Sequence, residues 1–328
     1  MKYVFVLLFL LMSLFSCSEK DLVRRLSVKD KVSEFSDTLF LGRVKNLLTY
    51  NNDIYFVEQY RNQIIKLDSC LNLKGLIGRM GEGPEELCNV SSFIIDNDII
   101  YVLDAGCAKL ISYGLDGNII ARYRLSEKVG LMPEFRFVVS GNDYMEMSVT
   151  DRRGAFGKMK LQSDSVSYWG ERTLFAHTDM EYVRNGRYLF KSSSGYVSIS
   201  DNEAIIEVYN FDKKKIMDYD YSSLEVVKRS LAYLDTQPMS SNSYGIICED
   251  AYMDGNQIYL LLSSYETMGY KANTVAVFEL QSDIRLKGVY QLAGSLYSSL
   301  CVLNGNVYAF ETKESILEKY SIMSSSVN

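Results

Sequence analysis

The feature that most constrains the fold is a short motif that recurs along the whole chain. Each copy has a turn containing Asn or Gly, followed by aliphatic or aromatic residues. Successive turns are separated by 45, 45 and 43 residues, then by about 70 and about 50. The six copies are Asn52-Asp53-Ile54-Tyr55, Asn97-Asp98-Ile99-Ile100-Tyr101, Asn142-Asp143-Tyr144-Met145, Asn185-Gly186-Arg187-Tyr188, Gly255-Asn256-Gln257-Ile258-Tyr259 and Gly305-Asn306-Val307-Tyr308. Because a period near 45 residues is the length of one four-stranded propeller blade, the sequence predicts an all-β, six-bladed β-propeller.

The first copy shows the four antiparallel strands of a blade most clearly. They are expected at residues 46–50, 54–58, 63–67 and 73–77, and are called a to d from the axis outward. In the second copy, Leu115-Asp116-Gly117-Asn118 is a strong hairpin signal between strands c and d. Antiparallel order places the d–a and b–c connections on one face of the ring. The a–b and c–d turns then lie on the opposite face.

The longest interval contains an insertion at about residues 220–243. Ser222-Ser223-Leu224-Glu225 has the capping-box pattern, and the apolar residues from Leu224 to Leu234 are spaced for one face of a helix. We therefore expect a small helix and a Ser-rich loop between the fourth and fifth blades. The insertion is expected to pack on the rim of the ring, with a lid as the alternative.

The last copy contains only three expected strands before the chain ends. We expect the run Thr38-Leu39-Phe40-Leu41 to supply the missing outer strand, because ring closure removes exposed sheet edges. The propeller would then comprise residues 35–328. Residues 17–34 would form the amino-terminal linker, since the stretch from 18 to 34 is charged and aperiodic.

The amino terminus has the features of an export signal. An apolar run from Val4 to Leu14 is too short to span a membrane comfortably and is typical of a secretory leader. It ends in Leu14-Phe15-Ser16-Cys17, which resembles the lipobox of bacterial lipoproteins. The resemblance implies that residues 1–16 are removed and that acyl chains on Cys17 anchor the protein to a membrane. Such a protein would lie in the cell envelope at the outer membrane, on its periplasmic or outer side. An ordinary signal peptide is the alternative.

A glycine-rich loop at residues 77–87 separates the first two blades. Gly78, Gly81, Gly83 and Pro84 indicate a shaped loop between strands. It resembles the glycine-proline loop of six-bladed β-propeller lipoproteins of Bacteroidetes, which are related to NHL and TolB-like propellers. The resemblance implies the same fold for most of the chain after Cys17.

The same loop is unsuited to a nucleotide. No Lys-Ser or Lys-Thr pair follows its glycines, and a strand rather than a helix is expected next, so we predict no dinucleotide or other cofactor. The expected role is structural. Pro84 would fix the turn, and Glu85 would pair with Arg79.

Composition excludes several other classes of function. A net charge of −6 gives no reason to expect nucleic acid as a partner. The single histidine, His177, and the absence of a G-x-S-x-G motif argue against a Ser-His-Asp hydrolase. Besides Cys17 there are five scattered cysteines without C-x-x-C spacing, which indicates buried free thiols rather than a zinc site or a full disulfide framework: Cys70, Cys88, Cys107, Cys248 and Cys301.

The face of the d–a and b–c connections is the expected ligand face because it mixes acids, arginines and tyrosines. Its candidate residues are Glu58, Tyr60, Arg61, Arg79, Glu82, Glu85, Asp104, Asp151, Arg152 and Tyr265. Such a surface suits a binding module for a peptide, a glycan or an envelope protein. Solvated loop charge is the alternative for each residue taken singly.

An enzymatic alternative uses three acids of this face. Glu58, Asp104 and Asp151 follow strand b in successive blades, and their carboxylates would converge on a metal ion near the central channel. The protein would then be a metal-dependent hydrolase or lyase of the lactonase-like propeller type. If the acids are solvated instead, no catalytic or metal site is expected.

Overall fold

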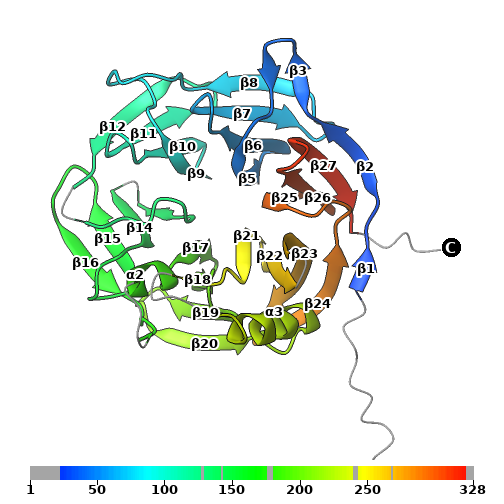
Figure 1. Cartoon of the computed structure of the whole chain (residues 1–328). Helices are drawn as coiled ribbons and strands as arrows, with labels where there is room; N and C mark the ends of the chain where they lie inside the picture. The colour runs from blue at the N-terminus through cyan, green and yellow to red at the C-terminus, as the bar shows by residue number, and fades with distance from the viewer. Residues whose placement is uncertain are drawn as a thin grey trace, which may run out of the picture.

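The computed structural model describes residues 23–126, 129–141, 143–175, 180–238, 243–266 and 269–322. Six four-stranded antiparallel arrangements surround a central axis, which confirms the predicted six-bladed propeller (Figure 1). Among the described residues, no helix is long and apolar enough to cross a membrane. His177 and Cys17 lie outside the described residues.

The first three blades run in chain order from the inner to the outer strand. Blade 1 contains β5 (Val44–Tyr50), β6 (Asp53–Glu58), β7 (Gln63–Asp68) and β8 (Leu73–Ile77). Blade 2 contains β9 (Val90–Asp96), β10 (Ile99–Asp104), β11 (Lys109–Gly114) and β12 (Ile119–Arg124). Blade 3 contains β13 (Val138–Ser140), β14 (Tyr144–Ser148), β15 (Phe156–Lys160) and β16 (Val166–Trp169).

The last three blades follow the same order, with additions at the outer edge. Blade 4 contains β17 (Arg187–Ser192), β18 (Gly195–Ser200), β19 (Ile205–Asn210) and β20 (Lys215–Asp220). Blade 5 contains β21 (Cys248–Asp254), β22 (Gln257–Glu266), β23 (Gly269–Leu280) and β24 (Ile284–Gln291). Blade 6 contains β25 (Tyr297–Leu303), β26 (Asn306–Glu311) and β27 (Ile316–Ser321).

The recurring turns connect strands a and b because their residues accept left-handed backbone. Asn51 and Asn52 have φ values of 49° and 64°, and Asn97 and Asp98 have values of 49° and 61°. Two consecutive positive φ angles make the tight turn that matches the twist of antiparallel strands. Buried apolar side chains then fill the spaces between neighbouring blades, so that the core forms a ring around the axis.

The amino terminus closes the ring, but with a different segment from the one predicted. Strand β2 (Val28–Val32) pairs antiparallel with β27 as the fourth strand of blade 6, beside it in Figure 1. Strand β1 (Val23–Arg25) adds in parallel to β24 of blade 5. The predicted closing run instead contributes β4 (Leu39–Phe40), which forms a small hairpin with β3 (Glu34–Ser36).

This result also corrects the expected linker, because residues 23–34 contain strands. Val28 and Val32 of β2 are half-buried, whereas the three residues between them are exposed and charged. A strand at a sheet edge keeps its charged side chains in water. The charges that suggested a linker are therefore those of an edge strand.

The insertion between blades 4 and 5 forms α3 (Glu225–Asp235), and a shorter helix, α2 (Glu181–Arg184), precedes blade 4. Helix α3 packs on the end of β22, where Ser230 Oγ donates to the Ser263 carbonyl at 3.3 Å. This contact places the helix on the rim, as expected. The capping box was predicted wrongly, because the residue that caps the helix is Leu224 and makes no side-chain capping bond.

Candidate functional site

Two of the predicted ligand-face acids hold loops of the scaffold. Glu58 is 1% exposed, and its carboxylate accepts the N–H groups of Arg43 at 3.0 Å and Arg61 at 2.9 Å. Asp104 is fully buried and accepts the N–H groups of Cys88 at 2.8 Å and Asn89 at 2.9 Å. Each acid thus ends strand b and binds the chain that enters strand a of its own blade.

Blade 6 repeats this arrangement, which shows that it belongs to the fold. Glu311 ends β26, and its carboxylate accepts the N–H groups of Leu296 at 3.2 Å and Glu314 at 2.8 Å. Asp151 differs because it is in a loop and pairs with Arg153 at 2.7 Å. Hydrogen bonds from Arg153 hold the pKa of Asp151 well below its usual range.

The three acids of the enzymatic alternative are therefore each engaged within their own blade. Among the described residues, one group of three possible metal ligands lies close together, namely Cys88, Asp104 and Cys107. Its two cysteines form a disulfide, and Asp104 already accepts the two loop N–H groups described above. The geometry does not bring Glu58, Asp104 and Asp151 to a common metal position.

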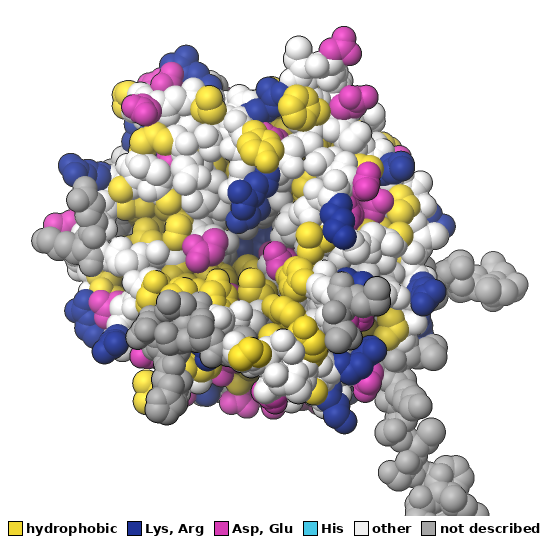
Figure 2. Space-filling view, in the orientation of Figure 1, with side chains coloured by type: hydrophobic (Ala, Val, Ile, Leu, Met, Phe, Trp, Pro, Cys, Tyr) yellow, Lys and Arg dark blue, Asp and Glu magenta, His cyan; other side chains and the backbone are white. Residues whose placement is uncertain are grey.

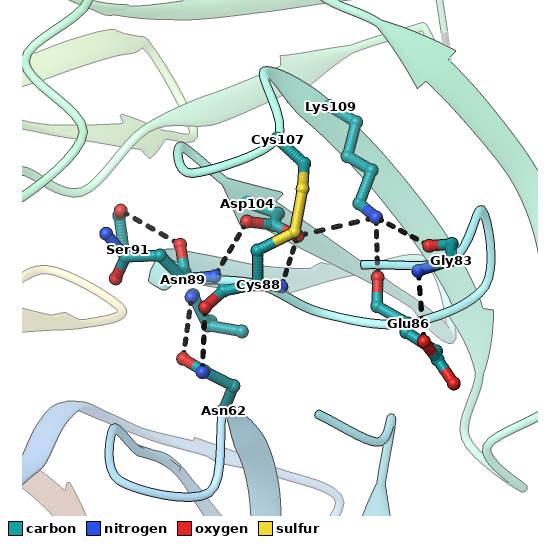
Figure 3. The surroundings of a disulfide bond; sticks show 10 residues. Asn62, Gly83, Glu86, Cys88, Asn89, Ser91, Asp104, Cys107 and Lys109 are labelled. Atoms are coloured by element: carbon teal, nitrogen blue, oxygen red, sulfur yellow. Dashed lines mark hydrogen bonds and ion pairs between the residues drawn. A yellow bond between two sulfur atoms is a disulfide. The ribbon is translucent and has the colours of Figure 1, made fainter. Parts of the chain in front are cut away.

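The glycine-rich loop is fastened to blade 2 by covalent and polar contacts (Figure 3). The Cys88–Cys107 disulfide joins it to the b–c connection of that blade. Lys109 Nζ donates to the carbonyl of Gly83 at 3.1 Å and lies 3.6 Å from Asp104. The expectation of free thiols is wrong for this pair, although Cys248 and Cys301 are buried and free, and Cys70 is free and exposed.

Ion pairs in the loop also differ from the expected pair. Arg79 lies 3.2 Å from Glu86, not Glu85, and Glu85 pairs with Arg122 of β12. Glu86 accepts the N–H of Gly83 at 2.9 Å. A side chain at Gly81 would meet the Glu86 carboxylate, because its Cβ would lie 2.0 Å from Oε2. The loop geometry thus confirms a shaped, structural turn.

The remaining predicted residues lie on the surface around the ring. Tyr60 is 69% exposed, and Arg61 donates to the Thr38 carbonyl and lies 5.6 Å over the Phe40 ring. Glu82 and Arg152 are exposed. These side chains come from separate connections of blades 1 to 3, whereas Tyr265 belongs to β22 of blade 5. The predicted ligand-face residues are therefore spread around the ring.

A more compact group lies where the inner strands meet the same face. We call it the mouth cluster; it contains Lys45, Asp201, Tyr244, Glu249, Tyr265 and Tyr270. Its members belong to blades 1, 4 and 5 and to the connection before β21. Figure 2 shows Lys and Arg side chains at the centre of the ring, flanked by acidic side chains and a band of hydrophobic ones.

Hydrogen bonds fix the aromatic side of the mouth cluster. The Tyr270 hydroxyl donates to the Glu249 carboxylate and lies 3.0 Å from Ser263 Oγ. The Tyr265 hydroxyl accepts the N–H of Ile246 at 2.8 Å. Glu249 is further held through its carbonyl, which accepts the Tyr188 hydroxyl at 2.6 Å. The carboxylate and phenol groups are therefore held in place before any ligand binds.

Burial perturbs the charged members of the mouth cluster. Desolvation lowers the pKa of Lys45, and Arg43 adds to the effect, although Glu134 and Glu249 oppose it. Desolvation raises the pKa of Asp201 to about 8, against the side-chain amide of Asn202. Burial also raises the pKa of Glu249, against its bond from Tyr270.

Opposite pKa shifts of neighbouring acids and a lysine are typical of a functional site. Lys45 makes no ion pair with any described residue, although the carboxyls of Glu134, Glu249 and Asp250 act on its pKa. An ammonium in this position is available to a ligand.

A buried ion pair connects the inner strands of several blades. The side chains of Arg136 and Asp250 are each only 5% exposed, and Arg136 Nη2 lies 2.9 Å from Asp250 Oδ2. Arg136 also donates to the Leu47 carbonyl at 3.0 Å. Asp250 accepts the Ser299 hydroxyl at 2.6 Å. This pair joins the inner strands of blades 1, 5 and 6 to the segment that enters blade 3.

Sequence reasoning found one member of the mouth cluster, Tyr265, and missed the others. Lys45 is the single charge of the inner strand Val44–Tyr50, and Glu249 lies beside Asp250 at the start of the inner strand Cys248–Asp254. A charge at such a position is the signal that would have pointed to the channel. Asp201 is the first residue after β18, one position later than the acids that end strand b in blades 1 and 2, Glu58 and Asp104.

Comparison with known proteins agrees with this architecture. Residues 34–166 match the model of the DUF5128 family, described as a 6-bladed beta-propeller. This match covers most of the first three blades, and the structure shows the six-bladed β-propeller fold across the described chain. The predicted resemblance is thereby confirmed. A search of curated proteins finds no match to this propeller.

Two solved structures from Bacteroides are similar to this propeller over most of their length. A member of the duf4221 family from Bacteroides vulgatus has a TM-score of 0.61 and 15% identity, covering 90% of this chain and 97% of the other. A putative exported protein from Bacteroides fragilis has a TM-score of 0.58 and 11% identity, covering 89% and 86%. At these identities the likeness concerns the fold alone.

Proposed function

We propose that this propeller is an extracytoplasmic, lipid-anchored binding protein whose mouth cluster receives a glycan, a peptide or a segment of an envelope protein. The observation that carries the proposal is the convergence of Lys45, Asp201 and Glu249 with three tyrosines at the channel mouth. Tyrosine rings offer apolar contact and hydroxyl groups together, which suits sugars and peptides.

Two findings support a location outside the cytoplasm. The Cys88–Cys107 disulfide is of a kind that persists in oxidising compartments. One similar structure is that of a protein described as exported. Together with the lipobox-like sequence before Cys17, these findings support anchoring in the cell envelope.

The protonation states suggest how a polar ligand would be held. With a pKa of about 8, Asp201 is mainly protonated at neutral pH and can donate a hydrogen bond. Lys45 supplies N–H donors, while Glu249 and the tyrosine oxygens can accept. This mixture of donors and acceptors suits a hydroxyl- or amide-rich ligand better than a single phosphate.

The test uses the soluble chain from Ser18 onward on arrays of glycans, peptidoglycan fragments and envelope-derived peptides. The highest-signal compound is then titrated calorimetrically. Lys45→Gln and Glu249→Gln are each expected to weaken its binding about tenfold, the effect of losing a charged hydrogen bond. Lys228→Gln, at an exposed lysine of α3, is the matched control. Unchanged affinity in both mouth variants would contradict the proposed site.

A further inference from the structure

A recess opens on the face of the ring opposite the mouth cluster. Its volume is about 860 Å³, and its walls come from the inner strands and turns of blades 1 to 5. The turn residues Ser193, Asn256 and Gln281 place its opening on the a–b and c–d face. We call it the turn-face cavity. Its volume is in the range of cavities that enclose small organic molecules.

Several polar side chains at the inner end of the turn-face cavity already have hydrogen-bond partners. Arg136 reaches the floor but is committed to Asp250 at 2.9 Å. The Thr49 hydroxyl donates to the Val302 carbonyl at 3.2 Å, so the Tyr252 hydroxyl donates to Thr49 at 2.7 Å. A ligand that reaches this end therefore meets Thr49 and Tyr252 hydroxyls that already have partners.

The walls above the floor are apolar. Ile94, Val138 and Leu189 contribute aliphatic side chains from three successive inner strands, and Phe190 adds an aromatic ring. Covering these walls releases water from apolar surface, so the part of a ligand that lies here gains affinity by being apolar.

The rim has a charged group on the side of blade 4. Lys191 lines the opening and makes no ion pair with any described residue. Ser192 ends β17, and Ser193 and Ser194 form the a–b turn; all three line the opening and carry hydroxyl groups. Asp96, on the side of blade 2, accepts the amide of Asn97 at 3.0 Å. An acidic head group is therefore favoured beside blade 4 and disfavoured beside blade 2.

We propose that the turn-face cavity binds an anionic amphiphile, a small molecule with an apolar body and one acidic head. The apolar body lies against the walls of the inner strands. The acidic head lies at the rim, with Lys191 and the serine hydroxyls of the blade 4 turn. This site is separate from the mouth cluster, because none of the residues that line it belongs to that cluster.

The probe is 8-anilinonaphthalene-1-sulfonate, whose fluorescence rises in an apolar environment, titrated into the soluble chain from Ser18 onward. Ser193→Trp places a large ring in an exposed turn at the opening and is expected to lower the affinity at least tenfold. Lys191→Gln is expected to lower it about two- to fivefold, the effect of an exposed ion pair. Lys228→Gln on α3 is the matched control and should leave the affinity unchanged.

Competition between the probe and two amphiphiles of opposite charge distinguishes recognition of an acidic head group from binding of the apolar tail alone. Dodecanoate should displace the probe, whereas dodecyltrimethylammonium, with the same tail and a cationic head, should displace it at least fivefold less well. All titrations stay below the micelle concentration of each competitor. Equal displacement by both compounds would overturn the anionic preference. Fluorescence unaffected by Ser193→Trp would show that the probe binds elsewhere and would overturn the site.

Discussion

Asp104 and Asp201 are both buried carboxyl groups, but their surroundings differ. Asp104 accepts loop N–H groups at 2.8 Å and 2.9 Å and lies 3.6 Å from the ammonium of Lys109. These partners satisfy the carboxylate oxygens of Asp104. Asp201 accepts the side-chain amide of Asn202 at 2.6 Å, yet desolvation dominates and raises its pKa to about 8. The first acid holds the scaffold, and the second titrates near neutral pH.

The raised pKa of Asp201 predicts a pH dependence of stability. The pKa rises from 3.8 to about 8 on folding, so the folded protein keeps a proton that the unfolded chain releases between these values. The stabilisation of the folded state that results from this bound proton is therefore fully present below about pH 4. It is lost as the pH rises through about 8. Asp201→Asn should flatten the decline between pH 5 and 8 in guanidinium unfolding.

The control for this experiment is Asp151→Asn, because the pKa of Asp151 is lowered rather than raised. Its contribution changes only in acid, so the slope between pH 5 and 8 should match that of the wild type. Identical slopes in Asp201→Asn and wild type would show that Asp201 does not bind a proton in the folded state.

At the scale of elements, the sequence predicted those features that local chemistry determines. The a–b turns were found because Asn and Gly are needed where φ is positive, as at Asn51 and Asn97. The closing strand was missed because β2, with its charged edge, has the composition of a linker. The mouth cluster was missed because Lys45 and Glu249 are about 200 residues apart and meet only once the ring closes.

The glycine-rich loop gives a prediction at this scale, because one disulfide and one lysine fasten it to blade 2. The cysteines are 19 residues apart, and the bond restricts the unfolded chain more than the folded one. Replacing both Cys88 and Cys107 by serine should lower the free energy of unfolding by about 2–4 kcal/mol. Urea unfolding measures the change, and Cys70→Ser, at an exposed free thiol, is the control. Equal stability of the double variant and this control would contradict a disulfide in the folded protein.

At the scale of the whole molecule, the ring depends on pairing between the two ends of the chain. Blade 6 takes three strands from the carboxyl-terminal end and its outer strand, β2, from the amino-terminal end. The same segment continues into β1, which covers the outer edge of blade 5. Because lipid attachment is proposed at Cys17, only five residues separate the anchor from strand β1 at Val23. Anchoring and ring closure would therefore involve the same stretch of chain.

Removing this stretch should open two sheet edges at once. A chain that begins at Ser33 lacks β1 and β2, so the backbone groups of β27 and β24 lose their partners and become available to other molecules. We expect its melting temperature to fall by at least about 5 °C, because hydrogen bonds and the half-buried Val28 and Val32 are lost. We also expect concentration-dependent self-association in light scattering after gel filtration. A chain that begins at Val23 keeps both strands and should remain monomeric with the melting temperature of the longer chain. If the chain from Ser33 matched it in both measurements, blade 6 would be stable with three strands and the amino-terminal closure would be dispensable.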